Sequence, residues 1–171
     1  MLRVRAWPLE LVNGVPLDPA ITAEHVDSLR SQLGLDLFAG FDPQRFPRTS
    51  LPALALAAAA YRRDDRLGEA VSLALRDALF EQGRDISRPE VLAGVAAAHG
   101  LEPSGPDDDE AVRADWREGQ SRGVSGSPHF YCGGLDSFCP SLDISRDADG
   151  HLRLRPDTAA LEAFLAGCFA A

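Results

Sequence analysis

The sequence pattern changes at Gly123, and this change limits the possible folds more than any other feature of the chain. Before Gly123, apolar side chains recur at the spacing of three and four residues that helices require. After it, short alternating runs are separated by turn residues such as Gly133-Gly134 and Asp149-Gly150. A chain of 171 residues that combines both patterns predicts a single α/β domain with its own core.

Five helices are predicted in the first part of the chain. Their expected bounds are Ile21 to Leu33, Ala53 to Tyr61, Arg66 to Gln82, Ser87 to His99 and Asp107 to Arg122. Ser50 is predicted to cap the second helix, and Ser87 to open a capping box with Glu90. The acidic run from Asp107 to Glu110 favours a helix start over a cation site, because consecutive Asp side chains point in different directions around a helix.

Alternating runs predict strands at both ends of the chain. Leu2 to Trp7 is expected to be an edge strand, and Pro128 to Cys132, Leu142 to Ile144 and His151 to Arg155 follow Gly123. A last helix is expected from about Asp157. Its apolar face would bury Leu161, Phe164, Leu165 and Cys168.

Charge and cysteine usage narrow the possible partners and the compartment. The net charge is −9, which argues against nucleic acid and anionic membranes as partners. The N-terminus lacks a signal-peptide pattern, and no window is apolar enough for a membrane span. We therefore expect a cytoplasmic protein whose three cysteines, Cys132, Cys139 and Cys168, are thiols.

The spacing of His129, Cys132 and Cys139 offers three potential metal ligands. It lacks the paired spacing of structural zinc sites, so we expect no metal and no cofactor here. Cys132 is predicted to lie on the same strand face as Phe130 and to act as a small apolar side chain. His99 is expected to contact the last carbonyls of its own helix.

The segment Gly123-Val124-Ser125-Gly126-Ser127-Pro128-His129-Phe130 resembles the cis-proline loop of DsbA-like thioredoxin-fold proteins. That superfamily also includes kappa-class glutathione transferases and 2-hydroxychromene-2-carboxylate isomerases. Further segments extend the resemblance over essentially the whole chain, namely VRAWPLELVNG near the N-terminus, the run from FPRTSLPALAL to FEQGRDIS, and the C-terminal hairpin and helix.

The resemblance implies an organisation for the chain. A thioredoxin-like core would comprise about residues 1–20 and 123–171, interrupted by a helical insertion at about 21–122. The first strand and first helix of the family, which carry its C-x-x-C or its catalytic Ser, have no counterpart here. No catalytic residue is therefore assigned. By resemblance, the Ser127–Pro128 bond would be cis and Ser127, Pro128 and His129 would contact substrate.

The implied activity is thiol–disulfide oxidoreduction on a thiol-containing protein. Because C-x-x-C is absent, we expect a truncated family member that is not redox-active as written. Two alternatives stay open. One is an isomerase or glutathione-transferase relative acting on a small molecule, and the other is a non-catalytic binding protein that retains the cis-proline groove.

The missing strand has a structural consequence. In the family it lies between the counterparts of Leu2 to Trp7 and Pro128 to Cys132. Without it, buried backbone groups would lose their hydrogen bonds, each at a cost of about 1 to 3 kcal/mol. We expect those two segments to pair antiparallel with each other. Otherwise a second chain would supply the strand, which makes a homodimer possible.

Overall fold

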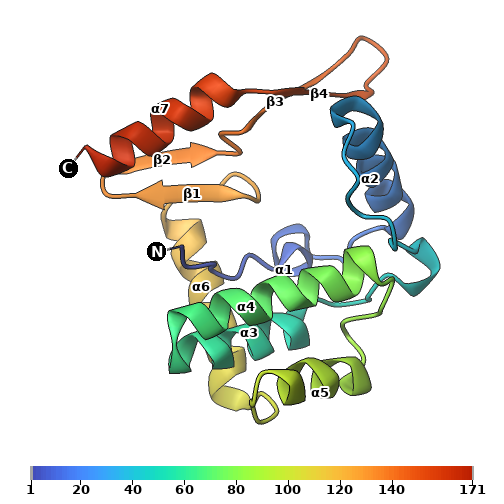
Figure 1. Cartoon of the computed structure of the whole chain (residues 1–171), viewed down its shortest axis with the longest axis vertical. Helices are drawn as coiled ribbons and strands as arrows, with labels where there is room; N and C mark the ends of the chain where they lie inside the picture. The colour runs from blue at the N-terminus through green and yellow to red at the C-terminus, as the bar shows by residue number, and fades with distance from the viewer. Residues whose placement is uncertain (1, 171) are drawn as a thin grey trace. The chain divides into compact units, whose positions relative to one another are not determined.

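A computed structural model describes residues 2–170 of the chain as a mixture of helices and strands (Figure 1). The helices are α1 (Leu9–Asn13), α2 (Pro19–Leu33), α3 (Leu51–Arg63), α4 (Asp65–Arg76), α5 (Pro89–Ala98), α6 (Pro106–Ser121) and α7 (Thr158–Phe169). The strands are β1 (His129–Cys132), β2 (Leu135–Phe138), β3 (Leu142–Arg146) and β4 (Leu152–Pro156). The predicted α/β class is confirmed.

Two compact units make up the chain. The helical unit comprises residues 2–23 and 37–119, and the strand unit comprises residues 24–36 and 120–170. The N-terminal residues belong to the helical unit. The single-domain division into core and insertion stays a prediction.

The core of the helical unit forms where α3 and α4 pack against each other. Their close approach depends on small residues, because Ala60 is fully buried and Gly68 faces the ring of Tyr61. A side chain at Gly68 would begin 2.2 Å from Tyr61 Cδ1. Helix α5 contributes Val91 and Val95 to the same core. Apolar burial at this contact is the main term that stabilises the unit.

The N-terminal segment Leu2–Trp7 does not form the predicted strand. Among the described residues it pairs with no strand, so the expected antiparallel ladder with Pro128–Cys132 is wrong. Its backbone bonds to helix side chains instead: Val4 N–H donates to Tyr61 Oη over 3.0 Å and Ala6 N–H donates to Asp115 Oδ2 over 2.9 Å. The alternating pattern reflects burial of Ala6, and side chains rather than a neighbouring strand accept the hydrogen bonds.

Two predicted helix starts differ in detail from the structure. Ser50 precedes α3, but its hydroxyl donates to Glu10 and makes no cap to its own helix. Ser87 bonds to Asp85, and Arg88 is the residue that precedes α5, so the predicted capping box is wrong. Serine spacing located the two helix starts, but both serine hydroxyls donate to carboxylates outside their helices, those of Glu10 and Asp85, instead of capping.

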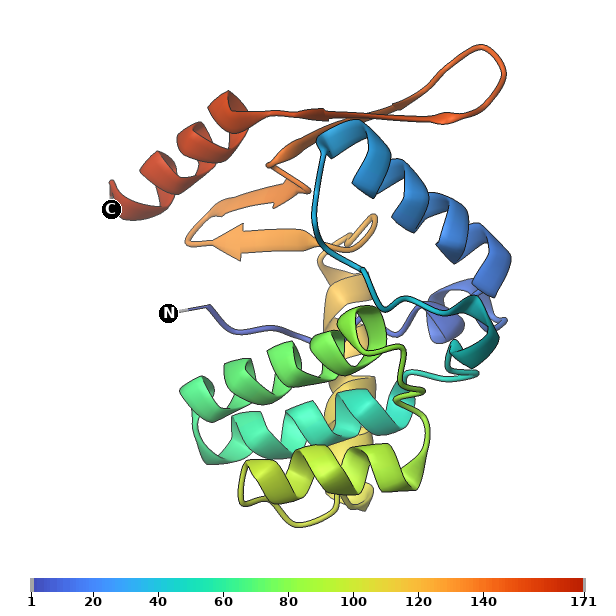
Figure 2. The same ribbon diagram turned by 45° about the vertical axis from the view of Figure 1, so that its right-hand side comes forward.

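The strand unit contains two antiparallel hairpins, β1–β2 and β3–β4, and helix α7 packs against β2. Figure 2 shows α7 beside the β1–β2 hairpin from a second direction. Register pairs His129 with Phe138 and Cys132 with Leu135 across the Gly133-Gly134 turn. Strand β2 was not predicted, because Leu135–Phe138 carries a short mixed sequence without clear alternation.

Within residues 2–170, no helix combines the length and the apolar character needed to cross a membrane.

Candidate functional site

The loop between α6 and β1 is held close to the β1–β2 hairpin. Gly123 adopts φ 72°, a left-handed conformation that ends the helix. The Ser127–Pro128 peptide bond is cis, which is the isomer that the resemblance to DsbA-like proteins implies. Pro128 O accepts a hydrogen bond from Cys139 N–H over 2.9 Å. A Cβ at Gly126 would begin 2.6 Å from the ring of Phe138, so only glycine lets the loop approach this closely.

Among the described residues, no strand pairs with the outer edge of β1. In an antiparallel pair, alternate residues direct their backbone groups toward the partner strand. The Pro128–Cys139 bond fixes this alternation, so that Phe130 and Cys132 face β2 while His129 and Tyr131 face away. We call the outward backbone groups of His129 and Tyr131, together with the exposed residue Ser127 that precedes the cis bond, the β1 edge.

No backbone hydrogen bond forms at the β1 edge within the part of the chain that the structure describes. Ser127 and Tyr131 are exposed, and His129 lies between them with its backbone directed the same way as that of Tyr131. An unpaired ladder of this kind presents alternating N–H donors and C=O acceptors at the spacing of an extended chain. The edge can therefore accept an additional strand.

The His129 side chain is buried on the face of β1 opposite Phe130. Only 7% of it is exposed, and its ring stacks on Tyr131 with centroids 4.8 Å apart and meets Phe138 edge-on at 6.5 Å. Its Nε2 lies 3.0 Å from Asp136 Oδ2, whereas its Nδ1 is buried without a hydrogen-bond partner among the described residues. A hydrogen on Nε2 directed to Asp136 leaves Nδ1 as an unused acceptor next to the β1 edge.

Arg122 lies over the exposed end of this aromatic group. Its guanidinium carbon is 5.1 Å from the centroid of the Tyr131 ring, and Tyr131 Oη donates to the Arg122 carbonyl over 3.3 Å. The cation and the hydrogen bond together fix Tyr131 between Arg122 and His129. The side chains on this face of the hairpin are thus ordered before any ligand binds.

His129, Cys132 and Cys139 do not come together. His129 and Cys132 are an odd number of residues apart on one strand and point to opposite faces. Cys139 pairs with Pro128, about four residues along the hairpin from Cys132, or roughly 13 Å. It is buried, and burial raises the pKa of its thiol. This spacing therefore builds neither a metal site nor a disulfide.

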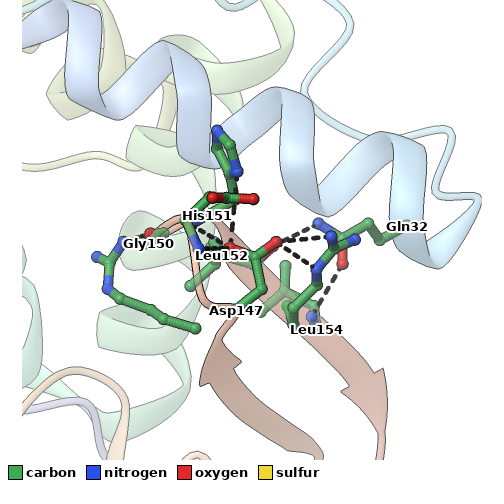
Figure 3. A network of polar contacts seen from close by, with 9 residues as sticks. Gln32, Asp147, Gly150, His151, Leu152 and Leu154 are labelled. Atoms are coloured by element: carbon green, nitrogen blue, oxygen red, sulfur yellow. Dashed lines mark hydrogen bonds and ion pairs between the residues drawn. The ribbon is translucent and has the colours of Figure 1, made fainter.

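One cluster of metal-type ligands occurs among the described residues, at the tip of the β3–β4 hairpin (Figure 3). The ligand atoms of Asp147, Asp149 and His151 lie within 4.8 Å of one another. Both Asp147 oxygens are already used: Oδ1 accepts from the backbone of His151 over 2.9 Å and Oδ2 from Arg153 Nη2 over 2.6 Å. Burial would raise the pKa of Asp147, but these hydrogen bonds lower it. The hydrogen bonds of Asp147 therefore stabilise the β3–β4 turn, and its carboxylate oxygens are already occupied.

A side chain covers the outer edge of β4, in contrast to that of β1. The Gln32 side chain from α2 donates to Leu152 O over 2.8 Å and accepts from Leu154 N–H over 3.0 Å (Figure 3). An amide side chain thus takes the place that a neighbouring peptide unit would occupy. The β1 edge has no equivalent cover among the described residues.

Two residues of this site were not predicted from the sequence. Asp136 and Phe138 surround His129, but they belong to the unpredicted strand β2 and carry no motif of their own. Their contribution follows only from the register of the hairpin. The expected substrate contacts of Ser127, Pro128 and His129 stay a prediction.

Comparison with known families gives one match. The family model described as the DSBA-like thioredoxin domain matches residues 2–148, which is most of the chain. No curated protein and no solved structure matches the sequence.

Proposed function

The chain belongs to the DSBA-like thioredoxin domain family, and from this premise we propose that it binds an extended, thiol-containing polypeptide along the β1 edge. Ser127, Pro128 and His129 form the contact surface. The observation that carries the proposal is the exposed residue Ser127, whose backbone makes no hydrogen bond within residues 2–170 and which directly precedes the cis bond that leads into β1. Strand addition of this kind gains its affinity from main-chain hydrogen bonds.

The His129 side chain next to the edge is fixed by its neighbours. His129 Nδ1 is a buried acceptor without a partner among the described residues, and leaving such an atom unpaired costs about 1 to 3 kcal/mol. The stacked ring of Tyr131 keeps the imidazole in place while the ligand binds.

We further propose that the chain does not catalyse dithiol–disulfide exchange. That reaction needs a reactive thiolate, which helix N-termini and C-x-x-C motifs provide by lowering a thiol pKa. Cys139 is buried with a raised pKa, and no C-x-x-C occurs in the sequence. The proposed role is therefore substrate binding without exchange.

A pair of substitutions at one position tests the binding site. A fluorescent, cysteine-containing peptide whose thiol has been alkylated should bind the wild-type protein, as measured by fluorescence polarisation. Ser127→Pro removes the edge N–H and should weaken binding by up to about tenfold, because one main-chain hydrogen bond is lost. Ser127→Ala keeps the backbone groups and serves as the matched control, with affinity close to wild type.

Equal affinities for the two variants would contradict binding through the backbone of Ser127. Saturable binding of glutathione, with no binding of the peptide, would favour the small-molecule alternative of the glutathione-transferase type.

Catalysis is tested separately with insulin and dithiothreitol. The purified chain should leave the rate of insulin reduction at the background level, because none of its thiols is activated. Turnover above background that disappears in Cys132→Ser would contradict this expectation. Exchange activity and peptide binding are measured in separate assays, so each part of the proposal can fail alone.

A further inference from the structure

Helix α7 packs against the β1–β2 hairpin of the strand unit, and its aromatic and cysteine residues match those of β1 in spacing. Phe164 of α7 meets Phe130 of β1 edge-on, with ring centroids 6.2 Å apart. Figure 1 shows the C-terminal end of α7 at the same end of the hairpin as the β1–β2 turn, so the helix and β1 run in the same direction.

From this contact, the two elements advance by nearly equal distances to their cysteines. Four residues of helix, from Phe164 to Cys168, rise about 6 Å. Two residues of strand, from Phe130 to Cys132, rise about 6.8 Å and return to the same face. The matched rise places the Cys168 thiol opposite the Cys132 thiol.

The contact beside this pair confirms the close approach. Gly167 precedes Cys168, and a Cβ there would begin 2.5 Å from Leu135 Cδ1. Leu135 is the cross-strand partner of Cys132. The absence of a side chain at Gly167 therefore lets the end of α7 approach the hairpin where Cys132 lies.

The two thiols interact with each other. The Cys132 thiol lies close enough to influence the pKa of the Cys168 thiol, and both cysteines are half-buried and free. Burial, together with the hydrogen bond and charge of Cys132, raises the pKa of the Cys168 thiol to about 11. At neutral pH that thiol is protonated and a weak nucleophile.

We propose that Cys132 and Cys168 form a dithiol site that low-molecular-weight disulfides oxidise to an intramolecular disulfide linking β1 to α7. This site lies outside any C-x-x-C motif and does not depend on peptide binding at the β1 edge. Cys139 takes no part, since it lies four residues along the hairpin from Cys132.

The reaction balances with glutathione disulfide as the oxidant. One cysteine thiolate attacks a sulfur of glutathione disulfide, which breaks that S–S bond, releases one glutathione and leaves a mixed disulfide. The second cysteine then attacks the protein sulfur, forms the Cys132–Cys168 bond and releases the second glutathione. Two protein thiols are oxidised, one glutathione disulfide is reduced, and the two thiol protons end on the two glutathione molecules.

Tryptic mapping of the oxidised protein tests the proposal directly. The whole protein is treated with glutathione disulfide, its remaining thiols are blocked with a maleimide, and intact masses and tryptic peptides are measured. Cleavage after Arg122, Arg146 and Arg153 separates residues 123–146, which hold Cys132 and Cys139, from residues 154–171, which hold Cys168. We expect a single blocked thiol per wild-type chain and a disulfide between these two peptides.

Cys139→Ser is the control that assigns the linkage. It should form the same cross-linked peptide pair with no thiol left to block, whereas Cys132→Ser and Cys168→Ser should form no cross-link. Oxidation should also accelerate as the pH is raised from 7 to 9, because more Cys168 is deprotonated.

Three results would overturn the proposal. They are a wild-type chain that keeps all three thiols after exhaustive oxidation, a cross-link that survives in Cys132→Ser but disappears in Cys139→Ser, and a disulfide found only between two chains.

Discussion

Glu10 shows how one carboxylate joins two helices of the helical unit. It lies in α1, and its oxygens accept hydrogen bonds from the Thr49 hydroxyl over 2.8 Å and from the Ser50 backbone N–H over 2.6 Å, just before α3 begins. Burial alone would raise the pKa of Glu10, but the backbone and hydroxyl donors outweigh it and the pKa is lowered. The negative charge also lies at the positive end of the α3 dipole.

Glu10→Gln should therefore destabilise the protein in a pH-dependent way. The lowered folded-state pKa means that Glu10 stabilises the fold above its unfolded pKa of 4.5 and loses this effect as the pH falls through its folded pKa. We expect a loss of about 1 kcal/mol in the free energy of unfolding at pH 7, allowing for partial solvent exposure, and a much smaller loss near pH 3. Urea unfolding followed by helical circular dichroism measures both.

Glu102→Gln, at an exposed position in the same unit, is the matched control and should change the unfolding free energy little at either pH. A loss for Glu10→Gln that is the same at pH 3 and pH 7 would assign the effect to packing rather than charge.

At the scale of elements, the α3–α4 contact depends on a missing side chain. Gly68 lies in the first turns of α4 and faces the Tyr61 ring, and Tyr61 Oη in turn accepts from Val4 N–H. A displaced Tyr61 would therefore disturb both the helix pair and the N-terminal segment. Helix propensity and packing act in opposite directions at this position.

Gly68→Ala should lower the free energy of unfolding by about 1 to 2 kcal/mol. Alanine gains about 1 kcal/mol as a helix former, but overpacking against a buried ring costs typically 1 to 3 kcal/mol, and an approach of 2.2 Å lies at the severe end. The same substitution at exposed Gly94 of α5 meets only Arg84 Nη2 at 3.8 Å, so it should stabilise by about 0.5 to 1 kcal/mol. Thermal unfolding of the two variants measures the opposite signs, and a stabilised Gly68→Ala would contradict the packing.

Helices α2 to α7 were predictable because their signals are local, whereas α1 (Leu9–Asn13) was not predicted. Apolar spacing and the glycine that follows located α2, and Gly34 indeed adopts φ 62° directly after its last residue. The structure of the N-terminal segment was not predictable, because an alternating pattern indicates which side chains are buried but not which groups the backbone bonds to. Tyr61 and Asp115 satisfy groups that a strand would otherwise pair with.

The candidate site was predictable only in its loop. The sequence located Ser127–Pro128 through a continuous motif, whereas the burial of His129 depends on Phe138 and Asp136 of an unpredicted strand. The approach of Cys168 to Cys132 depends on the packing of α7 and has no local signature. Sequence patterns describe neighbours along the chain, and these contacts join residues that are distant in it.

At the scale of the whole molecule, the proposed chemistry is concentrated in one unit. The β1 edge, the buried His129 and the two facing cysteines all belong to the strand unit, while the family match extends over both units. Within the strand unit, Gln32 covers the edge of β4 and leaves β1 as the open edge beside the cis-proline loop.

The most direct test of peptide binding at the β1 edge is a nuclear magnetic resonance titration of the ¹⁵N-labelled chain with the alkylated cysteine peptide. We expect the largest amide shifts, and new protection from hydrogen exchange, at Ser127, His129 and Tyr131, whose N–H groups are unpaired within residues 2–170. The amides of Phe130 and Cys132, already bonded to β2, should shift less. A saturable titration whose shifts and protection lie on other elements, with Ser127, His129 and Tyr131 unchanged, would contradict the account.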